Sequence, residues 1–122
     1  MKLDNIMLCE NGYLKLIDFG MSRLLEGDEL ATTYSGTAEY ISPEMLSRNA
    51  QYDTSIDWWA VGIIIYELIS GVTPFFNFNR QRLNDNIRNK KVLWLKDVKC
   101  SRELKDLVEK LLVKDPSARL GS

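Results

Sequence analysis

The pattern of apolar and polar positions predicts two well-defined helices in the second half of the chain. Residues 55–70 are apolar on nearly every side of a helix, which is typical of a helix buried at the centre of a larger body. Thr54 or Ser55 is a candidate N-cap, and Gly71 is a candidate C-cap. Residues 101–113 repeat apolar side chains at i, i+3, i+4, i+7 and i+8, which indicates an amphipathic helix.

The remaining segments give shorter patterns. Residues 5–18 predict a β-hairpin, because two short apolar runs flank a turn that ends in Asn-Gly. Residues 20–42 have little periodicity, and a connection of that length inside a compact domain tends to be functional. Ser42 is a candidate N-cap for a short helix that begins at Pro43, and residues 80–89 predict a further, weakly patterned helix.

Composition excludes several classes of function. The 122 residues contain no histidine, and neither Cys9 nor Cys100 belongs to a CxxC motif, so a zinc site or a histidine-based triad is almost excluded. The two thiols favour a reducing compartment. The sequence shows no signal peptide and no apolar run of the roughly 20 residues that span a bilayer. We therefore expect an intracellular, cytoplasmic protein without a transmembrane segment.

The formal net charge of −1 gives no reason to expect binding to nucleic acid. The charge is unevenly distributed, however. Residues 1–60 hold 4 basic and 10 acidic side chains, whereas residues 61–122 hold 12 basic and 7 acidic ones. The acidic half either attracts a basic peptide or is an ordinary solvated surface.

Oxygen-bearing side chains lie at both ends of the predicted hairpin. Asn5 precedes the first strand and Asp18 follows the second, so an amide oxygen and a carboxylate are expected close together, as in a magnesium site. Phe19 is expected to pack and fix Asp18, and Gly20 to let the backbone turn. Lys2 is placed to neutralise a transferring phosphate, or else it is a frayed terminal lysine. Together these groups are the parts that phosphoryl transfer requires.

Several ordered motifs resemble the second half of a eukaryotic protein kinase catalytic domain. They extend over essentially all of the chain: Met1-Lys2-Leu3-Asp4-Asn5 from the catalytic loop, Asp18-Phe19-Gly20, Ser42-Pro43-Glu44, Asp57-Trp58-Trp59-Ala60-Val61-Gly62, and Asp115-Pro116-Ser117-Ala118-Arg119-Leu120-Gly121. Lys2 and Gly36-Thr37 resemble serine/threonine kinases rather than tyrosine kinases. The similarity is to the group of cyclic-nucleotide-dependent kinases, protein kinase C and protein kinase B.

The resemblance implies a role for each matching residue. Asn5 and Asp18 would hold magnesium, Lys2 would contact the transferred phosphate of ATP, and Met7 would lie under the adenine. Thr33 occupies the position that an upstream kinase phosphorylates, with Thr32 as the neighbouring alternative.

Further residues are implied in regulation and substrate binding. Arg23 would pair with the phosphate on the activation loop. Thr37 would contact Lys2 and the substrate. Asp4 and Glu67 would read basic residues upstream of the target hydroxyl, although Glu67 is equally well explained as a carboxylate that fills a polar gap on a buried helix. Glu44 and Arg119 would form a buried ion pair.

The fold implied is the large, C-terminal lobe of an α+β kinase domain, mainly helical, with a small hairpin that carries the metal ligands. Residues 1–122 would be a partial kinase domain without the N-terminal lobe. The catalytic Asp, the Gly-rich loop and the V-A-I-K lysine have no counterpart in these residues, so this chain alone is expected to be inactive. Two alternatives remain: a catalytically dead module that binds kinase substrates or regulators, and a bare binder of magnesium and nucleotide.

Overall fold

The computed structural model describes residues 1–25, 30–32, 37–47 and 50–122, and its secondary structure is mainly helical. Within these ranges the chain forms three α-helices, one two-stranded antiparallel sheet and several short 3-10 turns. Their order is η1 (Leu3–Asn5), β1 (Ile6–Leu8), β2 (Leu14–Leu16), η2 (Ala38–Tyr40), η3 (Glu44–Leu46), α1 (Ser55–Ser70), α2 (Arg80–Asn89), α3 (Arg102–Leu111) and η4 (Pro116–Ala118). The predicted hairpin is present, as are the helices predicted at residues 55–70, 80–89 and 101–113.

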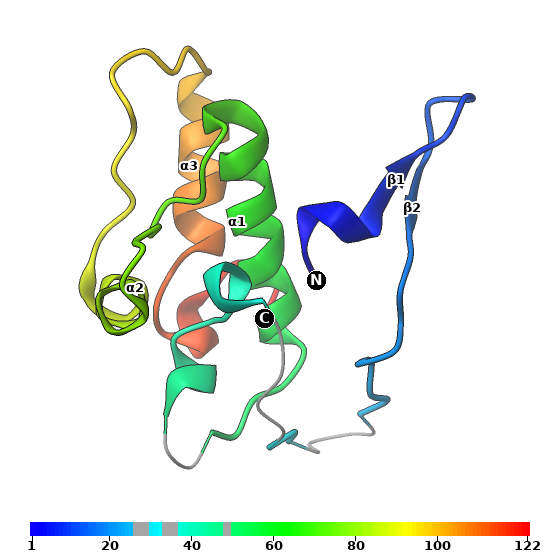
Figure 1. Cartoon of the computed structure of the whole chain (residues 1–122), viewed down its shortest axis with the longest axis vertical. Helices are drawn as coiled ribbons and strands as arrows, with labels where there is room; N and C mark the ends of the chain where they lie inside the picture. The colour runs from blue at the N-terminus through cyan, green and yellow to red at the C-terminus, as the bar shows by residue number, and fades with distance from the viewer. Residues whose placement is uncertain (26–29, 33–36, 48–49) are drawn as a thin grey trace.

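Helix α1 is the centre of the helical body, with α3 alongside it (Figure 1). Its Trp59, Ile63 and Tyr66 are buried in the main apolar cluster, together with Val108 of α3. The two helices approach closely at Gly62. A Cβ atom built there would lie 2.8 Å from Leu112 Cδ2, nearer than real contacts allow. The residue that lacks a side chain therefore permits this packing.

The ends of α1 differ in part from the prediction. Gly71 ends the helix in the left-handed conformation, with φ of 75°, as a C-cap glycine does. At the other end Thr54 makes no capping hydrogen bond through its side chain. Instead the Asp53 carboxylate accepts from the Ser55 N–H at 2.8 Å. Hydrogen bonding by Ser55 lowers the pKa of Asp53.

Helix α3 has the N-cap that α1 lacks. Ser101 Oγ accepts from the Leu104 N–H at 3.1 Å, and so pairs an N–H that has no partner inside the helix. We expect Ser101→Ala to lower the free energy of unfolding by about 1 kcal/mol. Thr54→Ala is the matched control, because Thr54 also precedes a helix but makes no such bond. Urea unfolding of both variants measures the difference, and equal losses would contradict the expectation.

Two shorter predictions were wrong. Ser42 does not cap the turn after it, because its hydroxyl is buried without a hydrogen-bond partner among the described residues. The short helix predicted there is present as η3, a single 3-10 turn that begins at Glu44. Helix α3 also ends at Leu111, two residues before the predicted end.

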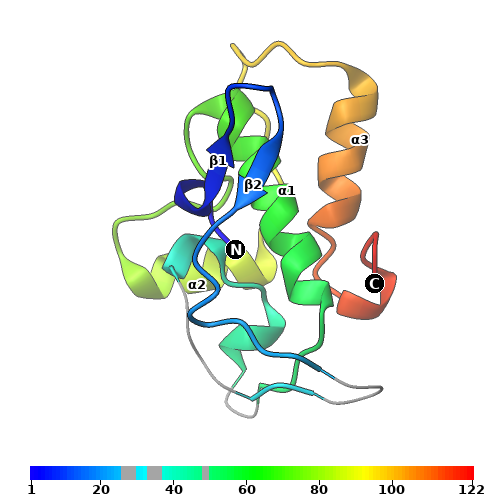
Figure 2. The same ribbon diagram turned by 90° about the vertical axis from the view of Figure 1, so that its right-hand side faces the viewer.

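The hairpin stands beside α1 rather than within the helical body (Figures 1 and 2). Between the two lies a cavity of about 390 Å³ whose lining is almost entirely apolar: Met1, Leu3, Ile6, Leu8, Leu14, Val61, Ile64, Ile65 and Leu68. One side of α1 is therefore in the core, and its other side faces this cavity. The predicted burial of this helix is therefore confirmed for the side that packs in the core.

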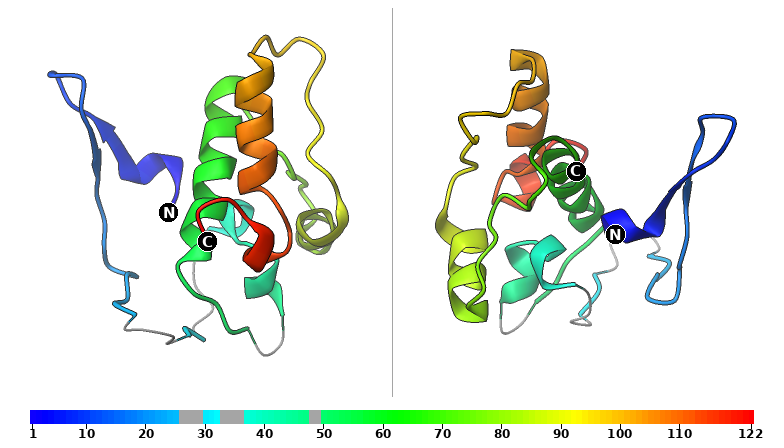
Figure 3. Two further views of the ribbon diagram at one scale, coloured as in Figure 1. Left: turned by 180° about the vertical axis from the view of Figure 1, so that it is seen from behind. Right: turned by 45° about the horizontal axis from the view of Figure 1, so that its top comes forward.

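The C-terminal residues return to the start of α1, and the N-terminus also lies close to this helix (Figure 3). The Leu120 N–H donates to the Lys110 carbonyl at 3.1 Å. In the described ranges, no helix is both long enough and apolar enough to cross a membrane.

Candidate functional site

The register of the hairpin brings Asn5 and Asp18 to the same end of it. Ile6 pairs with Leu16, and one step further the Ile17 N–H donates to the Asn5 carbonyl at 2.9 Å. Asp18 follows directly. The two strands are thus tied together beside both oxygen-bearing side chains.

The backbone of Asp18 is left-handed, with φ of 65°, the one such non-glycine residue in the described part of the chain. Asp and Asn adopt this conformation more readily than other non-glycine residues. Asp18 Oδ1 accepts from the Gly20 N–H at 3.2 Å, which closes a tight local turn. Phe19 does not pack and fix the carboxylate as expected, because its side chain is 66% exposed. The turn itself holds Asp18 instead.

An amide oxygen and a carboxylate at one end of a hairpin fit a magnesium ion that takes its other ligands from phosphate and water. No group of three or more His, Cys, Asp or Glu side chains that could hold a metal occurs in the described ranges. Asn5 and Asp18 alone would leave most ligand positions of a magnesium ion to other groups.

Lys2 and Asp4 lie next to this pair. Lys2 Nζ is 3.6 Å from Asp4 Oδ2, and the Asp4 side chain is 81% exposed. The Lys2 side chain is 35% exposed, and a partly exposed ion pair of this kind contributes little to stability. Met7 is on β1 and half exposed.

A separate contact joins η2 to α1. The Tyr40 hydroxyl donates to Glu67 Oε2 at 2.5 Å, and the Leu3 backbone lies within hydrogen-bonding reach of the same hydroxyl. Burial, followed by the Glu67 carboxylate, raises the pKa of Tyr40 far above its usual value of 10.0, so the phenol remains a donor. Glu67 therefore has the partner that a half-buried carboxylate needs.

We expect Tyr40→Phe to lower the free energy of unfolding by about 1 kcal/mol, because it leaves the Glu67 carboxylate without this donor. Tyr13→Phe is the control, since Tyr13 is 72% exposed at the turn of the hairpin. Chemical unfolding at neutral pH compares the two variants. A Tyr40→Phe chain as stable as the control would show that solvent replaces the lost hydrogen bond.

Glu39, the neighbour of Tyr40, makes a second link of this type. Thr73 Oγ1, which is buried beyond the end of α1, donates to Glu39 Oε2 at 2.6 Å. Sequence reasoning missed Glu39, Tyr40 and Thr73. The sequence pointed to Glu39 and Tyr40 in only one way: they are polar residues directly before a buried segment, inside the aperiodic residues 20–42.

The remaining candidate residues, which were expected to act in regulation and substrate binding, do not form one cluster. Thr37 is exposed and lies just before η2, and Arg23 is exposed in the segment that follows the hairpin. Thr33 lies outside the described residues.

Glu44 and Arg119 are brought together by two hydrogen bonds. Arg119 Nη1 donates to Glu44 Oε1 at 2.7 Å and Nη2 donates to Oε2 at 3.0 Å. Arg119 is 3% exposed and also donates to the carbonyls of Ser55 and Val113, each at 3.0 Å. One guanidinium therefore joins η3, the start of α1 and the segment after α3.

Lys114 is a second cation in this cluster, but its position is less favourable. Its Nζ lies 3.8 Å from the centre of the Phe75 ring and 4.9 Å from that of Trp59. The nitrogen is buried without a hydrogen-bond partner among the described residues. Burial, and then the charge of Arg119, lower the pKa of Lys114 from 10.5 to about 8.

This pKa predicts stability that depends on pH. The unfolded chain binds the proton of Lys114 more tightly than the folded chain, so stability rises as the pH rises from about 8 toward 10.5. The full shift corresponds to at most about 3 kcal/mol, and solvent screening of this half-buried group reduces it to about 1–2 kcal/mol. Lys114→Met is expected to remove the rise and to be more stable at pH 7.

Unfolding curves between pH 7.5 and 9.5 measure the effect. Lys110→Met is the control, since Lys110 is exposed and paired with Asp106 at 2.7 Å, and it should keep the rise. The charged group that acts on Lys114 is Arg119, which is itself paired with Glu44. An equal rise in the Lys114→Met chain would assign it to another group.

Comparison with known proteins places this chain in a family. The protein kinase domain matches residues 1–122. Protein kinase C of Drosophila melanogaster is 42% identical over 123 residues, covering 99% of this chain and 16% of that protein. Protein kinase C delta type of Rattus norvegicus is 38% identical, and cAMP-dependent protein kinase type 3 of Saccharomyces cerevisiae is 37% identical. These matches cover 99% and 100% of this chain and 18% and 29% of the two kinases.

The chain belongs to the protein kinase family. Within that family it is a serine/threonine protein kinase domain that resembles protein kinase C and the cAMP-dependent kinases, which confirms the resemblance seen in the motifs. The chain spans less than a third of the length of these relatives.

Proposed function

We propose that this chain forms the phosphate-facing and substrate-facing part of a serine/threonine kinase, which transfers the γ-phosphate of ATP to hydroxyl groups of proteins. The observation that carries the proposal is the hydrogen bond from Ile17 to Asn5, at 2.9 Å. It ties the hairpin at the end where Asn5 and Asp18 lie, in a chain whose whole length matches a kinase domain.

In this proposal Asn5 and Asp18 hold magnesium, which neutralises charge on the phosphates of ATP. Lys2 contacts the phosphate that is transferred, and Met7 contacts the adenine. The Asp18 turn fixes the position of its carboxylate before any ligand arrives, and preorganised charge of this kind is the main source of catalysis in phosphoryl transfer.

The reaction forms a bond from the substrate hydroxyl oxygen to the γ-phosphorus as the bond to ADP breaks. The hydroxyl proton goes to a general base, and none of these 122 residues corresponds to the family's catalytic Asp. An ATP-binding lobe is also required. We therefore propose that a polypeptide limited to these residues does not transfer phosphate by itself, and that it acts with those parts.

Substrates are proposed to carry basic residues before the target serine or threonine. Asp4 is exposed beside the hairpin, and the Glu67 carboxylate is oriented by the hydrogen bond that it accepts from Tyr40. Thr37 contacts the substrate, Thr33 is phosphorylated by an upstream kinase inside the cell, and Arg23 pairs with that phosphate.

The test is phosphate transfer by the natural protein that contains these residues, captured with an antibody against residues 80–100. Radiolabelled ATP and a serine peptide with upstream arginines are the substrates. The matched peptides replace the arginines with glutamates, or the serine with alanine. Transfer to the arginine peptide alone supports the proposal. Absence of transfer contradicts the proposed activity. Equal transfer to the glutamate peptide contradicts the proposed preference for basic residues.

A catalytically dead interaction module is the second candidate, and the apolar cavity beside α1 favours it. The same assay separates the two, because a module of this kind binds its partners without transferring phosphate.

A further inference from the structure

The connection between α2 and α3 contains an extended segment, residues 91–95, that lies along the surface of the helical body. Its side chains alternate between the two sides. Val92 and Trp94 pack against the apolar core, whereas Leu93 and Leu95 are 70% and 48% exposed. A period of two is the pattern of a β-strand. Within the described ranges, residues 91–94 make no hydrogen bond to another backbone group.

The inner side of this segment is firmly held. The Tyr66 hydroxyl donates to the Leu93 carbonyl at 2.6 Å, and Trp94 Nε1 donates to Glu109 Oε1 at 2.9 Å. The Trp94 ring also contacts Tyr66, at 5.0 Å between ring centres, and Lys105 Nζ, at 5.4 Å. The segment is thus fixed before any partner binds, which lowers the entropic cost of binding.

The chain is strongly basic along this segment and its flanks. Between residues 88 and 99 the chain has one acidic side chain, Asp97, and five basic ones, all exposed: Arg88, Lys90, Lys91, Lys96 and Lys99. Lysines beside an unpaired strand discourage pairing with an identical copy, because like charges meet. The same charges attract an acidic strand.

We propose that residues 91–95 bind an extended acidic segment of a partner protein, which adds to them as a β-strand. The Leu93 carbonyl is taken by Tyr66 and the Leu95 carbonyl by the Val98 N–H, so the backbone of the partner pairs with the N–H and C=O groups of Val92 and Trp94, which point to the opposite edge. The apolar side chains of the partner cover Leu93 and Leu95. Its carboxylates lie near Lys90, Lys91 and Lys96. A lipid surface would contact the lysines, Leu93 and Leu95, but it would leave the backbone groups of the segment unpaired.

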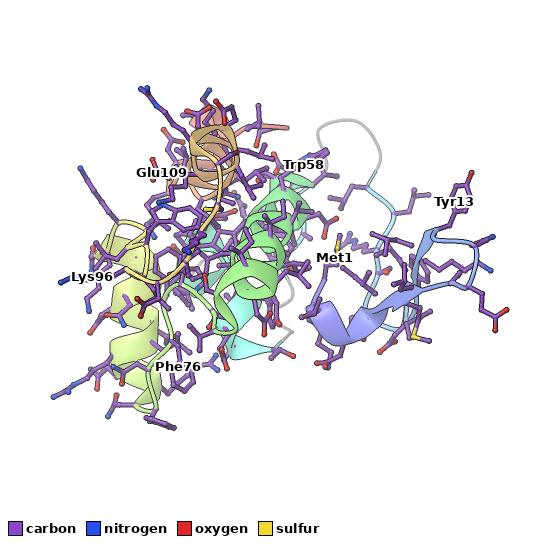
Figure 4. The ribbon with its side chains drawn as sticks, turned by 90° about the horizontal axis from the view of Figure 1, so that it is seen from above. Met1, Tyr13, Trp58, Phe76, Lys96 and Glu109 are labelled. Atoms are coloured by element: carbon purple, nitrogen blue, oxygen red, sulfur yellow. The ribbon has the colours of Figure 1, made fainter. Side chains whose placement is uncertain are left out.

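This surface is on the far side of the helical body from the hairpin (Figures 1 and 4). In Figure 4, Lys96 marks the proposed surface, Tyr13 marks the outer turn of the hairpin, and α1 lies between them. The proposal therefore does not depend on phosphate transfer, and binding here leaves the Asn5–Asp18 end accessible.

The test measures binding of the complete chain to a short fluorescent peptide of alternating glutamate and valine. A peptide of alternating lysine and valine controls for charge. A glutamate–valine peptide with alternate backbone nitrogens methylated keeps the charge and side chains but cannot pair as a strand. Binding of the first peptide alone supports the proposal. Equal binding of either control peptide, or binding of none, would overturn it.

Variants of exposed residues locate the site without disturbing the core. We expect Leu93→Asn, and separately Lys90→Glu with Lys96→Glu, to weaken binding at least about tenfold. Leu24→Asn is the matched control, because Leu24 is 79% exposed in the segment that follows the hairpin, and it should leave binding unchanged. Circular dichroism verifies that each variant is folded. Unchanged affinity in a folded Leu93→Asn chain would overturn the assignment, as would a chain that binds phosphatidylserine vesicles but not the peptide.

Discussion

Arg119→Ala is expected to lower the free energy of unfolding by about 3–5 kcal/mol, because it leaves a charge and two carbonyl groups stranded in a buried site. The guanidinium makes two hydrogen bonds to Glu44 and one each to the carbonyls of Ser55 and Val113. Its centre also lies 5.1 Å from the centre of the Trp59 ring. A domain is stable by only about 5–15 kcal/mol in total, so this variant should be largely unfolded in mild denaturant.

A second ion pair in the chain separates the effect of burial from that of distance. Lys110 and Asp106 are also 2.7 Å apart, but both side chains are more than half exposed. Lys110→Ala should therefore cost only about 0.3–0.5 kcal/mol. Urea unfolding of the two alanine variants, and of Glu44→Gln, tests the argument. Equal losses at the exposed and buried pairs would show that burial is not what gives Arg119 its importance.

The helices could be predicted because their signals are local. Gly71 ends α1 where it was expected, since an αL glycine closes a helix whatever lies around it. Ser101 caps α3 through a residue three positions away. The hairpin is equally local, because its Asn-Gly turn fixes the register that brings Asn5 and Asp18 together.

The contacts of the candidate site were harder to predict because they join distant segments. Tyr40 and Glu67 are 27 residues apart, and Glu39 and Thr73 are 34 apart, so no periodicity within one element reports them. The pair of Glu44 and Arg119, 75 residues apart, was expected only from the resemblance to a family. The position of Lys114 against two aromatic rings likewise depends on packing between elements.

Errors in the prediction have a common physical cause. Phe19 was expected to be packed because it is large and apolar, yet most of its surface is exposed. Ser42 was expected to cap a helix, yet it is buried without a partner among the described residues. In both cases residue type gives a preference, whereas the neighbours supplied by other elements decide the outcome.

The largest expected effect on activity concerns Asp18→Asn. Asparagine keeps an oxygen that can accept from the Gly20 N–H, and it also tolerates the left-handed backbone at this position, where φ is 65°. Alanine would lose the hydrogen bond and would be strained. Asp18→Asn therefore removes the negative charge while it preserves the turn that fixes the side chain.

On the proposed function, loss of this charge weakens the hold on magnesium at the hairpin and lowers phosphate transfer at least about a hundredfold, or ~2.7 kcal/mol. The free energy of unfolding should change by less than about 0.5 kcal/mol, since Asp18 is exposed. Asp97→Asn is the matched control and should affect neither quantity. Transfer is measured in the natural protein, and unfolding in the complete 122-residue chain. Full activity in Asp18→Asn would mean that the charge at the end of this hairpin does not act in catalysis, whereas a large loss of stability would mean that its role is structural.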